Sequence, residues 1–484
     1  MRLLQKAGHS NTIIGNSFLI FLIRFFPSLA TLLVVIFFSR NVSQETYGSY
    51  QNFWVQLFLL SSVATLGIPA FLLTYSPAFV KQLFAALKQK YYVAILIWMI
   101  VLAAIFTLVY SRDVTIGWFV PFGFFLVYSL SAIAESMLIV FRRFSLLLWV
   151  NVLYTVLFLL IHTGVLDGSY DIQTVFLYLL CLGLLKLIVT GIRAVTFLKN
   201  VAGETDNDYT MADIRSLWMH VGIYDVMQRV FTWIDKFAIS LLFASGVSAV
   251  YFNGTFDIPF LPLLLGAVSS AALMQMSGFS KKGDTEQSVA IANQTARILS
   301  AVVFPLFFFL FLFREELFTV LLTAKYAEAI PIFAVTVLVV PLRAYNFTSI
   351  LQNRHKGRVI NTGALMDLVL AIALMYPLYQ LFELKGIAMS FVISSYVQGA
   401  YYLYHTGKVL KTHVLQLIPL TNWLIKIIVF ASLFIAIHYA FSLLFTQAIV
   451  LILGSLILVI TLLVAIMIEL RASKKIHGRQ LSQE

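Results

Sequence analysis

Residues 217 to 243 read LWMHVGIYDVMQRVFTWIDKFAISLLF, an apolar stretch of membrane-spanning length that carries four charged side chains. The charges are Asp225, Arg229, Asp235 and Lys236. At about 100° per residue, Asp225, Arg229 and Lys236 fall on one side of a helix, so the stretch predicts a spanning helix with one polar stripe. A charge at the centre of such a helix costs roughly 2.5 to 3.5 kcal/mol on insertion scales, so the stripe must face protein or a watery cavity.

Two interpretations of this stripe stay open at the level of sequence. Asp225 and Arg229 have the i,i+4 spacing of an intrahelical ion pair, which favours a structural seam between helices. Charges of both signs also recur at membrane depth elsewhere in the chain, which favours a transport pathway lined by the stripe.

The composition identifies the class of protein. The chain has 484 residues, of which 61% are hydrophobic and 11% are charged, a balance that the surface of a large soluble domain does not tolerate. Its apolar runs are about 20 residues long and continuous, which predicts spanning helices rather than the strands of a β-barrel. A single cysteine, Cys181, excludes a disulfide framework and a cysteine metal site. The net charge of +12 does not indicate nucleic-acid binding, because in a membrane protein loop cations set topology.

The apolar runs predict an all-α polytopic membrane protein with fourteen spans. The N-terminus shows no cleavage site after a short apolar region, so the first span is expected to be a retained helix. The predicted spans are 13–38, 52–75, 91–110, 116–140, 145–165, 174–197, 217–243, 250–278, 291–313, 329–351, 360–381, 387–404, 420–444 and 447–470.

The loop cations predict the orientation of these spans. With a cytoplasmic N-terminus, most lysines and arginines of the loops fall on the cytoplasmic side, as the positive-inside rule requires. Both termini are therefore expected to be cytoplasmic. The pair Arg142 and Arg143 and the cluster 354–356 are interpreted as topology signals without chemistry.

Weak self-similarity predicts a duplication. The stretch 38–43 followed by Tyr47 resembles 243–248 followed by Tyr251, and 136–143 resembles 349–356. Six spans separate the copies, so the repeats are expected to be parallel. The expected domains are an N-lobe of six spans over 1–199, a cytoplasmic linker over 200–216, a C-lobe of six spans over 217–412, an appended helix pair over 413–470 and a basic cytoplasmic tail over 471–484.

Arg24 is the strongest single candidate for a functional residue. It lies about 16 Å into its predicted helix by rise, too deep to reach the interface comfortably, and Pro27 is expected to kink the helix beside it. Arg343 is similar but lies nearer the cytoplasmic end, where it either lines a cavity or extends to the interface. Three other cations are expected to extend to the interface from near helix ends, namely Arg193, Arg297 and Lys426.

The remaining buried charges are assigned by sign. A central cavity with positive character suits a phosphate or pyrophosphate group, and its candidate residues are Arg24, Arg229, Lys236 and Arg343. Carboxylates at membrane depth are candidate carriers of a proton or a sodium ion, and they are Asp225, Asp235, Asp257 and Glu135. No nucleotide-binding motif is present in the sequence, and no cofactor is expected.

Several short motifs together resemble the Wzx-type polysaccharide (O-antigen repeat unit) flippases of the MATE/MOP transporter superfamily. The similarity covers roughly residues 10 to 410. Its motifs are Val42-Ser43-Gln44-Glu45-Thr46-Tyr47-Gly48, Gly67-Ile68-Pro69, Ile234-Asp235-Lys236 with Tyr251 and Pro259, Tyr326 with Ala329, and Gly386-Ile387-Ala388. The chain departs from the family at Thr323-Ala324-Lys325, where a glycine is common.

The resemblance implies two pseudo-symmetric six-helix lobes in a V around a central cavity. It implies alternating access that moves an undecaprenyl-pyrophosphate-linked oligosaccharide from the cytoplasmic to the periplasmic leaflet of the bacterial inner membrane during lipopolysaccharide synthesis. It also implies coupling to a proton or sodium gradient, and glycan polymerase or ligase machinery as partners.

Other functions fit the same membrane topology. A lipid II flippase is a close alternative, and a cationic-drug antiporter of the same superfamily would favour an acidic cavity instead. An enzyme such as a membrane-embedded glycan polymerase, ligase or acyltransferase is disfavoured, because the sequence has no long periplasmic loop and no paired carboxylates near an interface.

Overall fold

The computed structural model describes residues 13–110, 117–200, 211–256 and 285–481, with single residues between 257 and 284. All regular secondary structure in these ranges is helical, which confirms the predicted all-α class. The chain divides into two compact units, Met1–Ala249 and Val250–Glu484. Among the described residues, nine helices are long and apolar enough to cross a membrane, so the protein is a polytopic membrane protein.

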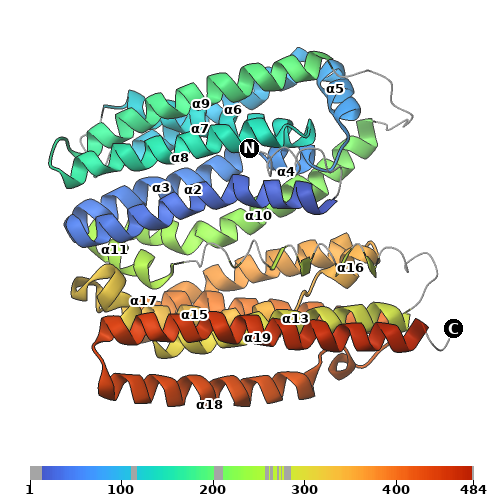
Figure 1. The fold of residues 1–484 in the computed structure, drawn as a ribbon. Helices are drawn as coiled ribbons and strands as arrows, with labels where there is room; N and C mark the ends of the chain where they lie inside the picture. The colour runs from blue at the N-terminus through green and yellow to red at the C-terminus, as the bar shows by residue number, and fades with distance from the viewer. Residues whose placement is uncertain are drawn as a thin grey trace. The chain divides into compact units, whose positions relative to one another are not determined.

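Most helices of the first unit match predicted spans, but the second predicted span, 52–75, is divided between α3, which begins eight residues earlier, and α4 (Figure 1). A further short helix of ten residues, α5, lies between the second and third predicted spans and was not predicted. The helices are α2 (Ile13–Asn41), α3 (Gln44–Ala64), α4 (Ile68–Leu72), α5 (Pro77–Ala86), α6 (Gln89–Tyr110), α7 (Phe119–Val140), α8 (Phe144–Leu166), α9 (Ile172–Asn200), α10 (Met211–Leu242) and the start of α11 (Ser245–Gly254).

Helix packing in the first unit places α2 against α8, α7 against α9, and α10 against α3. A buried apolar cluster joins Ile23 of α2 to Leu138 of α7 and Leu147 of α8. Lipid is as apolar as these side chains, so close packing rather than exclusion of water holds such helices together. The arrangement therefore depends on how closely the backbones can approach.

Two glycines of the family-like motifs permit such close approaches. A Cβ at Gly48 would lie 1.7 Å from the carbonyl oxygen of Ser245, and a Cβ at Gly67 would lie 2.4 Å from the Cα of Gly222. Gly67 also has a φ of +67°, a conformation in which a side chain is strained. Gly48 brings α3 against the start of α11, and Gly67 brings the turn before α4 against α10, so a larger residue at either position would separate these segments.

The second unit contains two helical hairpins and several short helices. The long helix α17 joins the eleventh and twelfth predicted spans, and Glu383 interrupts it with φ 54° and ψ −139°. The helices described in the second unit are α13 (Thr285–Leu312), α14 (Arg314–Leu317), η1 (Phe318–Leu322), η2 (Ala324–Tyr326), α15 (Ala329–Val337), η3 (Val340–Ala344), α16 (Ser349–Asn353), α17 (Gly357–Leu410), η4 (Val414–Gln416), α18 (Leu420–Leu444) and α19 (Gln447–Leu481).

Some predicted boundaries differ from the structure. The α10 helix begins at Met211, inside the predicted linker, and α19 continues to Leu481, into the predicted basic tail. The tenth predicted span is divided among α15, η3 and α16, with Pro341 at the start of η3. The eighth predicted span and the rest of the linker lie mostly outside the described residues. The predicted lobe boundaries stay a prediction.

One part of the predicted duplication is visible as a repeated turn. Arg142 and His355 both have a positive φ, 54° and 52°, directly after helices that end on the matching motifs. The amide of Arg143 donates to the carbonyl of Leu138 at 2.9 Å, and that of Lys356 donates to Leu351 at 2.8 Å. The same helix-ending hydrogen-bond pattern therefore recurs at both copies.

The other predicted match pairs Tyr47 with Tyr251, but the helix starts align Tyr251 with a different tyrosine. After a break, helices restart at Gln44 and Ser245, so Tyr50 rather than Tyr47 stands at the position of Tyr251. All three tyrosines are buried.

Two of the cations expected to extend to the interface are paired with one carboxylate of the second unit. Arg297 on α13 and Lys426 on α18 both form ion pairs with Glu469 on α19, at 3.0 Å each. Lys426 also donates to the Ser300 hydroxyl at 2.9 Å, and Asn422 donates to Glu469 at 3.1 Å. The appended pair α18 and α19 is therefore joined to α13 through a buried polar cluster, because an anion on α19 was available to satisfy both cations.

Candidate functional site

The polar stripe of α10 is exposed in its first half and buried in its second. Asp225 and Arg229 form an intrahelical ion pair at 2.9 Å, with 25% and 54% of their side chains exposed. Asp235 and Lys236 lie about 10 Å further along the helix by rise and are 7% and 11% exposed, with 3.7 Å between their charged atoms. The packing of α3 on this half of α10, where Gln56 donates to the Ser240 hydroxyl at 3.2 Å, accounts for the burial.

Arg24 lies in the middle of α2 with an exposed side chain. Its neighbour Ile23 packs in the apolar cluster with α7 and α8, of which Arg24 is not a member. Within the described part of the chain, no carboxylate lies within ion-pair distance of Arg24, although Arg229 and Glu135 lie close enough to interact with it electrostatically.

The α2 helix runs from Ile13 to Asn41 with Pro27 inside it. Proline has no N–H for the carbonyl of Ile23, four residues earlier. The side-chain amide of Asn151 on α8 donates to that carbonyl at 3.3 Å instead. Thus α8 compensates for the proline and holds the α2 backbone next to Arg24.

Glu135 forms an ion pair with Lys186, which was not predicted as a functional residue. Its carboxylate on α7 lies 2.6 Å from the ammonium of Lys186 on α9. The same ammonium lies 4.6 Å from the centre of the Tyr154 ring on α8. Glu135 is therefore not the partner of Arg24, and three helices meet around the Lys186 charge.

These groups form one charged cluster in the first unit, defined by Arg24, Glu135, Lys186, Asp225 and Arg229. Two of its three cations are paired with carboxylates, and Arg24 is the third. An exposed guanidinium at this depth would be costly in lipid, so its surroundings must be aqueous or occupied by an anion. The cluster can thus receive an anionic group, and the fork of a guanidinium suits phosphate oxygens.

The other predicted residues lie elsewhere or outside the described residues. Arg343 is exposed in η3 of the second unit, where the carboxylate of Asp367 on α17 interacts with it electrostatically. Asp257 lies outside the described residues. The structure therefore brings together Arg24, Arg229, Asp225 and Glu135, and leaves Asp235 and Lys236 in the buried half of α10.

Lys186, Tyr128 and Asp367 were not predicted as functional residues. Lys186 holds Glu135, and Tyr128 on α7 interacts electrostatically with both Arg229 and Glu135. Asp367 is 3% exposed, and its Oδ1 atom lacks a hydrogen-bond partner in the described part of the chain. The signal for Tyr128 was present in the sequence, since Tyr128 and Glu135 are seven residues apart and share one helix face.

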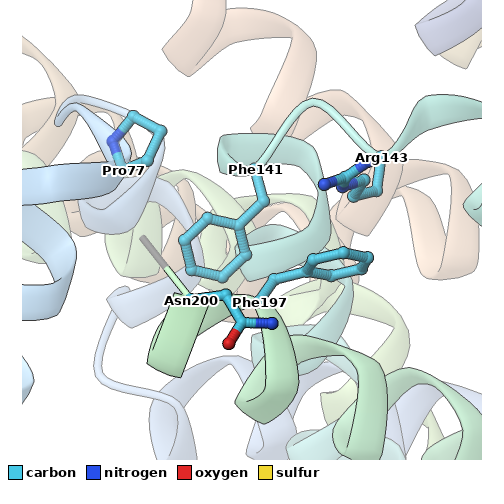
Figure 2. A pocket seen from close by; sticks show the side chains of 5 residues that line it. All are labelled: Pro77, Phe141, Arg143, Phe197 and Asn200. Atoms are coloured by element: carbon cyan, nitrogen blue, oxygen red, sulfur yellow. The ribbon is translucent and has the colours of Figure 1, made fainter. Parts of the chain in front are cut away.

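A separate cavity of about 130 Å³ lies at the turn between α7 and α8 (Figure 2). It is lined by Pro77, Phe141, Arg143, Phe197 and Asn200. The guanidinium of Arg143 stacks on the Phe197 ring at 4.0 Å. None of the charged-cluster residues lines this cavity.

The described residues contain no group of three or more His, Cys, Asp or Glu side chains that could hold a metal ion.

Comparison with known proteins shows the fold. No protein-family model matches the sequence, and neither does any curated protein. A solved structure of the lipid II flippase MurJ in an inward closed conformation matches with a TM-score of 0.64 at 14% identity, over 93% of this chain and 98% of that one. An outward-facing multidrug resistance MATE family transporter of the MOP superfamily matches with a TM-score of 0.56 at 14% identity, over 82% and 94% of the two chains.

An inward-facing MATE transporter is similar to a lesser degree, with a TM-score of 0.50 at 14% identity over 79% of this chain. The chain thus has the fold of these flippases and transporters over nearly all of its length. At such identities the comparison establishes the architecture and not the cargo.

Proposed function

We propose that this protein is a flippase that moves an undecaprenyl-pyrophosphate-linked oligosaccharide across the bacterial inner membrane by alternating access. The observation that carries the proposal is Arg24, a guanidinium in the middle of a spanning helix with an exposed side chain and no ion-pair partner among the described residues. A cation at that depth costs free energy in a lipid environment, and a bound pyrophosphate would offset this cost.

The neighbouring ion pairs support this role. Asp225 pairs with Arg229 on the same helix, and both side chains are partly exposed. A pyrophosphate that binds Arg24 and Arg229 would compete with Asp225 for Arg229. Asp225 is then free to take up a proton or a sodium ion, which couples substrate binding to an ion gradient. Lys236, Arg343, Asp235, Asp257 and Glu135 remain predicted members of the pathway.

A lipid II flippase is the second candidate, because the MurJ fold matches along nearly the whole chain and lipid II offers the same type of anionic lipid group. A cationic-drug antiporter is less consistent with an exposed, unpaired Arg24. A glycan polymerase or ligase lacks support, since the matching solved structures are a flippase and transporters.

Deletion of the gene in its own host tests the proposal. We expect complete lipid-linked repeat units to accumulate on the inner leaflet, and the wild-type chain but not Arg24→Ala to restore export. Accumulation of lipid II instead would favour the second candidate. Export of single, unpolymerised units would show that flipping is intact, and it would contradict both transport proposals.

A further inference from the structure

Beside the charged cluster, three aromatic side chains from three helices contact one another. The Phe58 ring on α3 lies with its centre 5.6 Å from that of Tyr128 on α7 and 5.0 Å from that of Trp233 on α10. Tyr128 is 36% exposed, and the other two are half-buried behind it. We call Phe58, Tyr128 and Trp233 the aromatic platform.

The platform continues a row of aromatic contacts between α3 and α7. One helical turn away, Trp54 on α3 and Phe124 on α7 face each other at 5.6 Å, and Phe124 is only 4% exposed. Trp54 also contacts Phe58 at 5.5 Å. The contact between Trp54 and Phe124 already packs α3 against α7. Packing alone therefore does not require an exposed aromatic side chain at Tyr128, one turn further along.

The platform adjoins the cations of the charged cluster. Trp233 follows Arg229 by four residues, so the two side chains are neighbours on one face of α10. Tyr128 lies on the same face of α7 as Glu135 and interacts electrostatically with Arg229 and Glu135. Arg229 and Tyr128 are both exposed, and an exposed arginine at this depth is costly in lipid, so we take the Tyr128 ring to share the surroundings of Arg229.

We propose that the aromatic platform binds the sugar residue next to the pyrophosphate, with one face of the pyranose ring against Tyr128. The C–H groups of a pyranose face are weakly positive and suit the negative face of an aromatic ring, while the sugar hydroxyls stay available to water and polar groups. A sugar linked directly to a pyrophosphate must lie next to the groups that hold that pyrophosphate. Tyr128 would then select lipids that carry a sugar over the bare lipid pyrophosphate.

This inference rests on the proposed function, because the arginines are taken to hold the pyrophosphate. Two probes separate the two ideas: undecaprenyl pyrophosphate, and the same lipid with one N-acetylglucosamine attached. Binding to the purified full chain in nanodiscs is measured for wild type, Arg24→Ala, Tyr128→Ala and Tyr128→Phe. The control is Tyr376→Ala, which removes a 71% exposed tyrosine from α17 of the second unit.

We expect the wild type to bind the sugar-bearing probe more tightly than the bare one. Tyr128→Ala should weaken binding of the sugar-bearing probe by about 2- to 10-fold without changing that of the bare probe, as loss of one aromatic contact predicts. Tyr128→Phe and Tyr376→Ala should behave like wild type, and Arg24→Ala should weaken both probes. Phe58→Leu is a second platform variant should Tyr128→Ala fail to fold, and it should also lower the preference for sugar.

Each contrary result has a separate meaning. If Arg24→Ala weakens both probes but Tyr128→Ala and Phe58→Leu keep the wild-type ratio, the platform is wrong and the pyrophosphate site stands. If Arg24→Ala binds both probes as the wild type does while Tyr128→Ala loses the preference, the pyrophosphate site is wrong and the platform stands. Failure of the wild type to bind either probe would overturn both.

Discussion

The charged cluster of the first unit and the polar cluster around Glu469 in the second unit satisfy their charges to different extents. In the second unit the carboxylate of Glu469 is 6% exposed, pairs with the buried Lys426 and the half-buried Arg297, and accepts a hydrogen bond from Asn422, so these charges are satisfied. In the first unit Arg229 is 54% exposed, and Arg24 is exposed without an ion-pair partner in the described residues. Satisfied charges hold helices together, whereas an exposed and unpaired cation indicates a ligand.

Removing the shared anion of the second unit is the largest expected effect on stability. Glu469→Gln should leave the buried Lys426 and the half-buried Arg297 without an anion and lower the free energy of unfolding by about 3 kcal/mol. Thermal unfolding in detergent measures the loss. Replacing Glu469, Arg297 and Lys426 together with apolar residues should recover much of it, and a wild-type melting temperature for Glu469→Gln would break the comparison.

Removing Arg24 should have the reverse signature. Arg24→Ala should weaken binding of undecaprenyl pyrophosphate by about 10- to 100-fold, since a hydrogen bond to a charged group contributes about 1.5 to 3 kcal/mol. Unfolding should change by less than about 0.5 kcal/mol, because the side chain is exposed. Arg24→Lys should recover part of the affinity, because it restores the charge without the fork.

The matched control is Arg193→Ala, which removes another exposed arginine from the first unit, on α9. It should leave both binding and stability unchanged. Equal losses of affinity in the two variants would show a general effect of surface charge and not a site at Arg24.

Glu135 tests whether the first unit also contains a structural ion pair. Glu135→Gln should leave Lys186 without its anion and destabilise the protein by about 1 to 3 kcal/mol, with recovery in a Glu135→Gln, Lys186→Met double variant. Unfolding curves of the single and double variants provide the measurement. If instead a double alanine variant of Arg24 and Glu135 regained stability and transport, Arg24 would belong to a structural pair.

A charge outside the spans provides a reference for a simple helix-capping role. Asp171 precedes α9 and accepts hydrogen bonds from the Thr174 hydroxyl at 2.7 Å and the Thr174 amide at 3.0 Å, which lower the pKa of its carboxyl group. Asp171→Ala should cost about 1 kcal/mol at neutral pH. Because the folded pKa is depressed, this stability is present above the unfolded pKa of about 3.9 and is lost as the pH falls through the lower folded value.

Unfolding of Asp171→Ala and wild type at several pH values measures this dependence. The difference between them should shrink only below about pH 4. A difference that stayed constant at lower pH would show that the carboxylate charge does not contribute.

The smallest expected effect on stability is at the exposed pair of α10. Asp225→Asn should change unfolding by only about 0.3 to 0.5 kcal/mol, as for other exposed i,i+4 pairs. It should nevertheless abolish gradient-driven transport if Asp225 carries the ion. Asp235→Asn, in the buried half, is the companion variant. Transport assays in proteoliposomes across imposed pH and sodium gradients measure both, and normal transport in both variants would exclude these carboxylates as carriers.

Much of the fold follows from local sequence. Long apolar runs form spanning helices because lipid leaves backbone groups no other partners, and this property belongs to each segment by itself. The turn after Val140 and its copy after Asn353 were also recognisable, because short motifs determine helix ends. The extra helix α5 was missed because ten residues are too few to stand out from a loop.

The charged residues of the first unit were likewise evident from the sequence, since any charge within an apolar run is exceptional. Their partners were not. Glu135 could have paired with Arg24 by depth alone, and only the packing of α7 against α9 brings it to Lys186. Glu469 satisfies Arg297 and Lys426 for the same reason, across more than a hundred residues of chain in one case.

The sequence by itself determined that this protein spans a membrane with helices and that it places charges inside them, because hydrophobicity and helical spacing are local properties. Only the folded arrangement shows which charges are neutralised, which half of the α10 stripe is exposed, and that Tyr128 interacts electrostatically with Arg229. Ion pairing and exposure depend on contacts between helices that are distant in the chain, and packing geometry rather than residue type selects those contacts.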